Sequence, residues 1–200
     1  MRRFLLLLVV ILSAFTSWLI WMTSERTSQK ITADQSDAPG EAVGGDFTLT
    51  DQQGRTVRAS DFRGRIMLVF FGFTRCPDIC PVTVATLSKT MELLGADAGH
   101  AAAIFISVDP ERDTPAVMKD YLSNFDPHMV GLTGTPGQIR KATEAYKVYF
   151  AKAPQPQGSD YTVDHSTFIY MMGKDGKFLQ VFENNADAAD IARAVRHAWE

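Results

Sequence analysis

Cysteine, histidine and net positive charge are all scarce in this chain of 200 residues. Its two cysteines exclude a scaffold held by several disulfides and a zinc site built from four thiolates. With four histidines in total, any metal centre has to be small. Twenty Lys and Arg against 23 Asp and Glu give a formal net charge of −3, so no nucleic-acid partner is expected. The hydrophobic fraction of 46% is typical of an ordinary folded protein.

The chain has one long uncharged apolar segment, from Phe4 to Met22. At about 1.5 Å per residue, a helix over this segment is about 28 Å long, close to the hydrocarbon thickness of a bilayer. Arg2 and Arg3 precede it, and the positive-inside rule keeps that end in the cytoplasm. A cleaved signal peptide is the alternative, but the apolar run continues where a small-x-small cleavage site would be needed. We therefore expect residues 1–22 to be an uncleaved membrane anchor.

The next segment, residues 23–45, is polar and has no periodic apolar face, so we expect a flexible tether. Residues 46–200 then form one folded domain, long enough for a single hydrophobic core. An anchor with its basic end in the cytoplasm places this domain on the exported side. Because nothing resembles a mitochondrial transit sequence, we expect a bacterial inner-membrane protein with one membrane span and its C-terminal domain in the periplasm.

The pattern along residues 46–200 is that of a mixed α/β domain. Phe47–Thr50 and Arg55–Arg58 flank a glycine turn, which predicts a β-hairpin. Two nearly continuous apolar runs, Ile66–Phe73 and Ala102–Val108, predict central strands that are covered on both faces. The remaining predicted elements are a helix after the cysteines, helices at Thr114–Phe125, Thr135–Tyr146 and Asp187–Trp199, and strands at His165–Met172 and Lys177–Phe182. This order fits a thioredoxin-like fold with an N-terminal β-hairpin extension.

The two cysteines follow the first central strand, in the sequence Cys76-Pro-Asp-Ile-Cys80-Pro81. In open α/β sheets, functional sites form at this carboxyl edge of the strands. Pro81 suits the first turn of a helix, so Cys80 is expected at the N-cap, where the helix dipole favours a thiolate. Arg75 adds a positive charge beside Cys76. We therefore expect a lowered pKa for at least one of the two thiols.

Three uses of this cysteine pair remain open from the residues alone. A structural disulfide would close so short a loop that it contributes only about 2 kcal/mol. A redox-active dithiol is usually Cys-x-x-Cys, whereas here three residues separate the cysteines. Such proteins also have a proline just before the penultimate strand, and here Tyr161–Ser166 occupies that position. His165 in this segment favours a metal site, because two thiolates and one imidazole are a soft donor set that suits copper. Closed zinc sites need a fourth ligand, and the sequence offers no clear one.

These residues resemble those of the Sco/SenC/PrrC family of thioredoxin-fold copper proteins. The resemblance covers about residues 46–199, and its most specific segments are Phe71-Gly-Phe-Thr-Arg-Cys76-Pro-Asp-Ile-Cys80-Pro, Ser107-Val-Asp-Pro-Glu-Arg-Asp-Thr-Pro115 and Tyr161-Thr-Val-Asp164-His165-Ser. It implies that Cys76, Cys80 and His165 ligate one copper ion per chain, as Cu(I), Cu(II) or both. Arg75 departs from the pattern, since many members have histidine before the first cysteine.

The resemblance also implies a copper chaperone that assists assembly of the dinuclear copper centre of cytochrome c oxidase. Its partners would be the copper-binding subunit of the oxidase, a copper donor, and a thiol reductant that keeps Cys76 and Cys80 from forming a disulfide. No catalytic turnover is required for this role. The alternative is a thiol–disulfide oxidoreductase that uses the same dithiol to reduce the copper-ligand cysteines of the oxidase subunit.

Several neighbouring residues receive plainer interpretations. Asp164 is expected either to orient His165 or to be an ordinary loop carboxylate. The charged residues of Asp109–Asp113 are expected to form a polar turn that caps the following helix. Met171 and Met172 are expected in the core at strand spacing, and not as thioether ligands.

Overall fold

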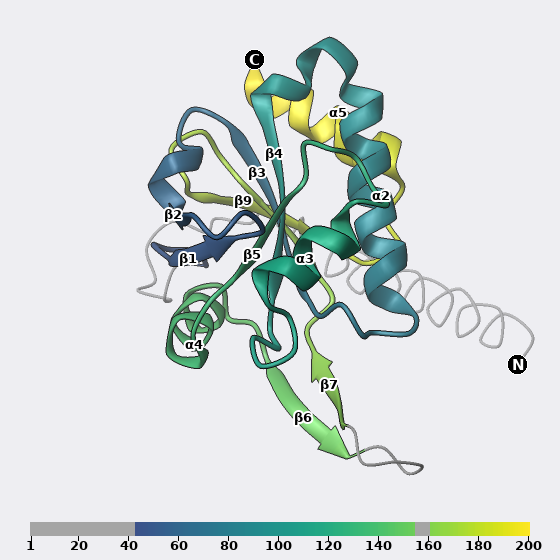
Figure 1. Ribbon diagram of the computed structural model, residues 1–200. Coiled ribbons are helices and arrows are strands. Elements are labelled where there is room, and N and C mark those ends of the chain that lie inside the picture. The colour runs from purple at the N-terminus through teal and green to yellow at the C-terminus, as the bar shows by residue number, and fades with distance from the viewer. Residues whose placement is uncertain (1–42, 155–160) are drawn as a thin grey trace, which may run out of the picture. The chain divides into compact units, whose positions relative to one another are not determined.

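The structure, a computed structural model, describes residues 43–154 and 161–200, all within the compact unit Glu41–Glu200 (Figure 1). The expected anchor, residues 1–22, and nearly all of the expected tether lie outside the described residues. In the part of the chain that the structure describes, no helix is long and apolar enough to cross a bilayer. The anchor and the tether therefore stay predictions from the sequence.

A seven-stranded mixed sheet forms the centre of the domain, in the strand order β2-β1-β5-β4-β3-β8-β9. Its strands are β1 (Thr48–Asp51), β2 (Thr56–Arg58), β3 (Ile66–Gly72), β4 (Ala101–Ser107), β5 (Val130–Thr133), β8 (Ile169–Met172) and β9 (Phe178–Phe182). β3 and β4 run parallel at the middle, and every residue of both is buried, as the continuous apolar runs predicted. The predicted N-terminal hairpin is confirmed by β1 and β2, which pair antiparallel.

Three of the helices begin at residues whose side chains cap them. The helical elements are η1 (Ala59–Phe62), α2 (Ile79–Leu94), η2 (Gly95–His100), α3 (Pro115–Leu122), α4 (Pro136–Ala145) and α5 (Ala188–Trp199). The side chains of Thr114 and Asp187 accept backbone N–H groups at the starts of α3 and α5, and Thr135 forms a reciprocal capping box with Gln138 at α4. α2 and α5 pack against each other beside the sheet (Figure 1). These helices confirm the predicted mixed α/β architecture.

A separate two-stranded ribbon, made of β6 (Phe150–Pro154) and β7 (Tyr161–His165), projects from the main sheet (Figure 1). The sequence predicted a single strand over His165–Met172, which is wrong: His165 ends β7, and β8 begins at Ile169. Between them the chain changes its pairing partner from β6 to β3. Strand propensity does not specify which strand supplies the pairing, so the pattern did not reveal this change.

The hydrophobic core extends through the strands that lead to the cysteines. Phe70 of β3 stacks on Phe105 of β4, with ring centroids 5.9 Å apart. Met171 and Met172 of β8 are buried in the same core, which confirms their predicted packing role. β3 ends at Gly72, and the chain leaves the core after the buried Phe73 to form the cysteine loop. Because the interior is closely packed, the loop starts from a rigid frame.

Candidate metal centre

The two cysteines lie where the central strand β3 is joined to α2. Cys76 is partly exposed in the loop, whereas Cys80 is fully buried as the second residue of α2. The sequence predicted Cys80 at the N-cap, which is wrong, because the N-cap is Asp78. Pro81 is compatible with this earlier start, since the third helical position still belongs to the first turn, where N–H groups have no helical acceptor. Both cysteines are free thiols.

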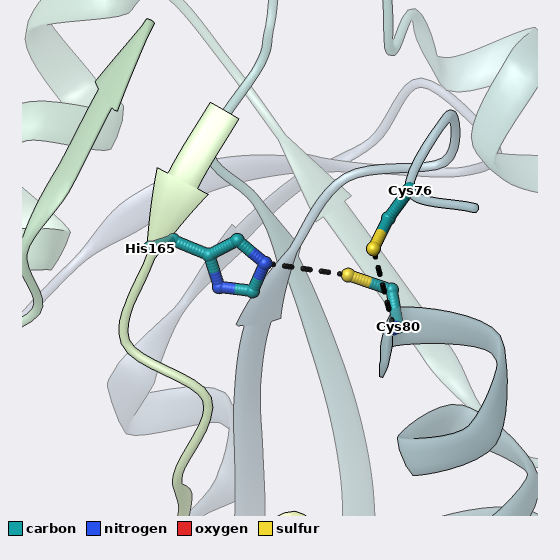
Figure 2. A group of neighbouring side chains, drawn as sticks. All are labelled: Cys76, Cys80 and His165. Atoms are coloured by element: carbon teal, nitrogen blue, oxygen red, sulfur yellow. Dashed lines mark hydrogen bonds between the residues drawn. The ribbon is translucent and has the colours of Figure 1, made fainter. Parts of the chain in front are cut away.

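His165 approaches the cysteines from β7, and 85 positions separate it from Cys80. Its ring stands edge-on against Phe73 and Phe70, at centroid distances of 5.8 and 6.1 Å. Nδ1 lies 2.8 Å from the carbonyl oxygen of Ser166, and because a carbonyl only accepts, Nδ1 carries the proton. In the neutral form of the ring, this tautomer leaves the Nε2 lone pair for a ligand. Nε2 points at Cys80 Sγ, 3.4 Å away (Figure 2).

The structure brings together all three residues that the sequence singled out as metal ligands. One ligand atom from each of Cys76, Cys80 and His165 lies within 4.8 Å of the other two, and the three side chains face one another (Figure 2). Among the described residues, Asp164 does not join this group: it is exposed on β7, and the orienting contact to His165 comes from the Ser166 carbonyl. A role for Asp164 at the site stays a prediction.

The two thiols differ in acid–base character. A hydrogen bond from the Cys80 thiol, with further contacts from His165 and from the N–H groups of Asp78 and Cys80, lowers the pKa of Cys76 to about 3. The same thiol–thiol bond, together with burial, raises the pKa of Cys80. The Cys80 N–H donates to Cys76 Sγ at 3.4 Å, so the start of α2 points a donor at Cys76. One lowered pKa was predicted and is confirmed, but the thiolate is in the loop and not on the helix.

Asp113 holds the start of the cysteine loop. Its carboxylate is fully buried and accepts the Thr74 N–H at 3.0 Å, the Thr74 hydroxyl at 2.6 Å and the Ser107 hydroxyl at 2.6 Å. Burial raises the pKa of this carboxyl group. Thr74 precedes Cys76 by two residues, so these bonds fix the backbone from which Cys76 projects. From the sequence, Asp113 was predicted only to belong to a polar turn. Thr74 and Ser107, polar residues that end or follow two central strands, were the signal in the sequence that could have indicated this buried contact.

The donor atoms decide which metal the group can hold. Two sulfurs and one imidazole nitrogen form a soft set that fits copper, and Cu(I) in particular. A closed zinc site requires a fourth protein ligand, and no carboxylate or further histidine joins the group within the described ranges. Binding through both thiolates requires the Cys80 thiol to lose its proton, so rising pH favours binding.

Comparison with known proteins assigns this geometry to a family. A model of the SCO1/SenC family matches residues 35–200. The chain belongs to this family. It is 38% identical to Protein sco1 of Schizosaccharomyces pombe over 194 residues, which cover 93% of this chain and 74% of that protein.

Solved Sco structures resemble the domain throughout. The structure of Bradyrhizobium japonicum ScoI with copper bound is 46% identical, has a TM-score of 0.74, and covers 78% of this chain and 99% of its own. A structure of BsSco, in which a disulfide switch was identified, is 29% identical and has a TM-score of 0.63. The match covers 83% of this chain and 98% of the BsSco chain. The thioredoxin-like α/β fold predicted from the sequence is thereby confirmed.

Proposed function

We propose that this Sco-family protein is a copper chaperone in which Cys76, Cys80 and His165 bind one copper ion per chain. The observation that carries the proposal is the convergence of two sulfur atoms and one imidazole nitrogen within 4.8 Å. In a neutral imidazole, the Ser166 contact holds the proton on Nδ1, so the nitrogen that faces Cys80 Sγ has the free lone pair. The copper-bound relative supports the choice of metal.

The proposed recipient is the copper-binding subunit of cytochrome c oxidase, in which the ion would enter the dinuclear copper centre. Support comes from BsSco, which is described as a member of the Sco family of cytochrome c oxidase assembly proteins. A copper donor has to load the site. A thiol reductant has to keep Cys76 and Cys80 reduced, because a disulfide cannot supply thiolate ligands.

The side chains are suited to both uptake and release. Cys76 is partly exposed and ionised at neutral pH, so it can make the first contact with incoming copper. Cys80 loses its proton as it binds, and the oriented Nε2 of His165 adds the third donor without rotation of the ring. Three protein donors leave room for a ligand from the recipient. Copper can then pass to the recipient by exchange of one ligand at a time.

We propose residues 1–22 as a membrane anchor, residues 23–45 as a tether and residues 46–200 as the copper-binding domain, in the periplasm at a bacterial inner membrane. The apolar run Phe4–Met22 behind Arg2 and Arg3 supports this topology. A polar tether of this length has a mean end-to-end distance of about 26 Å. The domain could then reach a recipient that is itself embedded in the membrane.

A thiol–disulfide oxidoreductase is the second candidate, favoured by the pairing of a thiolate at Cys76 with a buried thiol at Cys80. The Cys76 thiolate would attack a disulfide of the oxidase subunit and form a mixed disulfide. Cys80, deprotonated, would then attack Cys76 Sγ, release the reduced partner and leave a Cys76–Cys80 disulfide. Two electrons pass from this dithiol to the partner, and the thiol reductant restores it.

The deciding experiment is a competitive titration with Cu(I) and a coloured Cu(I) chelator, under exclusion of oxygen, on the reduced full-length protein in detergent. The variants are Cys76→Ser, Cys80→Ser and His165→Ala. His128→Ala is the matched control, because His128 is an exposed histidine that pairs with Asp126 away from the cysteines. Reduction of a small model disulfide is measured on the same samples.

A chaperone predicts one Cu(I) per chain, at least tenfold weaker binding in each of the three site variants, and unchanged binding in His128→Ala. Disulfide reduction should survive His165→Ala, because the imidazole is not part of the dithiol. If the parent binds no copper, or His165→Ala binds it as tightly as the parent, the ligand assignment fails and the oxidoreductase becomes the better interpretation.

A further inference from the structure

The strand that carries His165 does not belong to the main sheet, so other contacts have to fix its position. A two-stranded ribbon is only marginally stable by itself in water. At the end of β7 away from His165, Tyr161 makes polar contacts with the turn after β4, residues 109–113, which was predicted to be an ordinary polar turn. An exposed ion pair between Lys152 of β6 and Glu111 reaches the same turn, but exposed pairs contribute little.

Arg112 lies at the centre of these contacts. Its Nε donates to the Asp109 carboxylate, and its Nη1 donates to the carbonyl oxygen of Tyr161 at 2.8 Å. The guanidinium carbon lies 3.8 Å from the centroid of the Tyr161 ring, and the Tyr161 hydroxyl donates to Asp109 at 2.7 Å. The side chains of Arg112 and Asp109 are only 11% and 1% exposed. Charge-assisted bonds that are shielded from water in this way are strong and directional.

The same turn also supports the cysteine loop. The Ser107 hydroxyl donates to Asp113, which holds Thr74, and accepts the Asp109 N–H at 3.0 Å. Arg112 further faces the ring of Phe73 at 5.8 Å, and this is the ring on which the His165 imidazole packs. One short turn therefore contacts both segments that supply ligand atoms.

We propose that Arg112 is a positioning residue for the metal site. With Asp109 and Tyr161 it forms a latch that holds β7, so that His165 Nε2 stays beside Cys80 Sγ. The inference rests on the proposed ligand role of His165. With the latch intact, copper meets three donors. With the latch released, β7 and its imidazole move away, and only the two sulfurs on the rigid β3–α2 frame remain.

The test is a double-mutant cycle that combines Arg112→Lys with His165→Ala in the full-length protein. Lysine keeps a positive charge for the buried Asp109 but lacks the planar fork that also reaches the Tyr161 carbonyl. Tyr161→Phe, which deletes the bond to Asp109, is the second latch variant. The matched controls are Arg193→Lys on the exposed face of α5 and Tyr146→Phe, whose buried hydroxyl has no hydrogen-bond partner among the described residues. Cu(I) affinity and amide hydrogen exchange of the copper-free protein are measured.

We expect Arg112→Lys to weaken Cu(I) binding at least fivefold when His165 is present and less than twofold when His165 is alanine. A loss of similar size in both backgrounds would overturn the proposal, because Arg112 would then act through the fold or the cysteine loop. Unchanged affinity in both backgrounds would overturn it as well. If Arg112→Lys does not fold, the same cycle is run with Tyr161→Phe and interpreted by the same criteria.

Hydrogen exchange separates this inference from the proposed function. In the copper-free protein, amides of β6 and β7 should exchange at least fivefold faster in both latch variants, while those of β3 and β4 and both controls stay at the parent rate. If the parent binds no copper, the proposed function fails but the latch is still tested. Unchanged exchange in the ribbon would then contradict the latch itself.

Discussion

Gly72 lies against the sulfur of Cys80, so closely that a Cβ at position 72 would be 2.8 Å from Cys80 Sγ. The same Cβ would be 2.9 Å from the ring of Phe105 and 3.0 Å from that of Phe70. Side chains do not tolerate such distances. A glycine inside a strand often marks a close approach of this kind, and here Gly72, at the end of β3, makes space for the buried Cys80 thiol.

Gly72→Ala should therefore damage both the fold and the site. We expect a loss of about 1–3 kcal/mol in the free energy of unfolding from overpacking, with weaker Cu(I) binding because Cys80 is displaced. Urea unfolding and the chelator competition measure the two effects. Gly99→Ala is the control, because no atom of the described part of the chain lies within 4 Å of a Cβ at that position. Equal stability of the two variants would contradict the packing argument.

The low pKa of Cys76 predicts an unusual pH profile for thiol alkylation. A thiol with a pKa of about 3 is ionised at every pH above that value and loses its charge only as the pH falls through about 3. The rate of Cys76 alkylation should therefore stay nearly level from pH 8 down to pH 5. An ordinary thiol would become tenfold slower for each pH unit below its pKa, and such a decline in the parent protein would refute the assignment.

The cause of this low pKa can be tested separately. Because the Cys80 thiol is its largest cause, Cys80→Ala should raise the pKa of Cys76 and restore the decline of the alkylation rate at low pH. Mass spectrometry identifies the alkylated cysteine. Arg75→Gln is the matched control for a simple charge effect. If the alkylation rate declined at low pH in Arg75→Gln and not in Cys80→Ala, the low pKa of Cys76 would be due to Arg75.

Removal of the Asp113 carboxylate should loosen the cysteine loop. Asp113→Asn keeps one acceptor oxygen but turns an amide donor toward the donors of Thr74 and Ser107, which we expect to cost about 1–3 kcal/mol of unfolding free energy. Amide exchange near Cys76 should also become faster. The exposed Asp190→Asn on α5 serves as control and should change stability by less than about 0.5 kcal/mol. A neutral outcome at Asp113 would show that the loop is held by other contacts.

Tyr146 should make the domain sensitive to alkali. Burial raises the pKa of its phenol to about 12, above the value of 10.0 for a free side chain. The folded state thus favours the neutral phenol, and the stability that this contributes is complete below pH 10 and is lost as the pH rises toward 12. Between pH 9 and 11.5 the loss should be about 2 kcal/mol. In urea unfolding, the free energy of unfolding of Tyr146→Phe should decline correspondingly less over this pH range. That of Tyr149→Phe, a variant at an exposed tyrosine, should decline as much as in the parent.

The frame of the domain could be predicted because its signals are local. The apolar runs of β3 and β4 specify strands that are buried on both faces, and Thr114 and Thr135 mark helix starts by side-chain chemistry alone. The three ligand candidates followed from the rarity of cysteine and from a histidine in the segment that the fold brings to the cysteines. The types of donor atom at the candidate site can therefore be predicted from the sequence.

What the sequence did not reveal depends on partners far along the chain. Asp113 can be buried because Thr74, 39 positions earlier, donates hydrogen bonds to its carboxylate. Asp109 can be buried because the hydroxyl of Tyr161, 52 positions later, donates to it. A carboxylate without such partners would stay in water, so its type alone predicts an exposed turn. The ribbon was missed for the same reason, since pairing of β6 with β7 is a relation between segments and not a property of either.

Because Cys80 and His165 are 85 positions apart, only a folded chain can present the complete set of donors. On the proposed function, copper is then a ligand of the native state and stabilises it by mass action, by about 2.7 kcal/mol at a free concentration of 100 times the dissociation constant. Thermal unfolding with and without Cu(I) measures this difference, and equal midpoints would contradict it. Delivery of the ion removes this stabilisation, so the emptied protein is the form most open to unfolding and proteolysis.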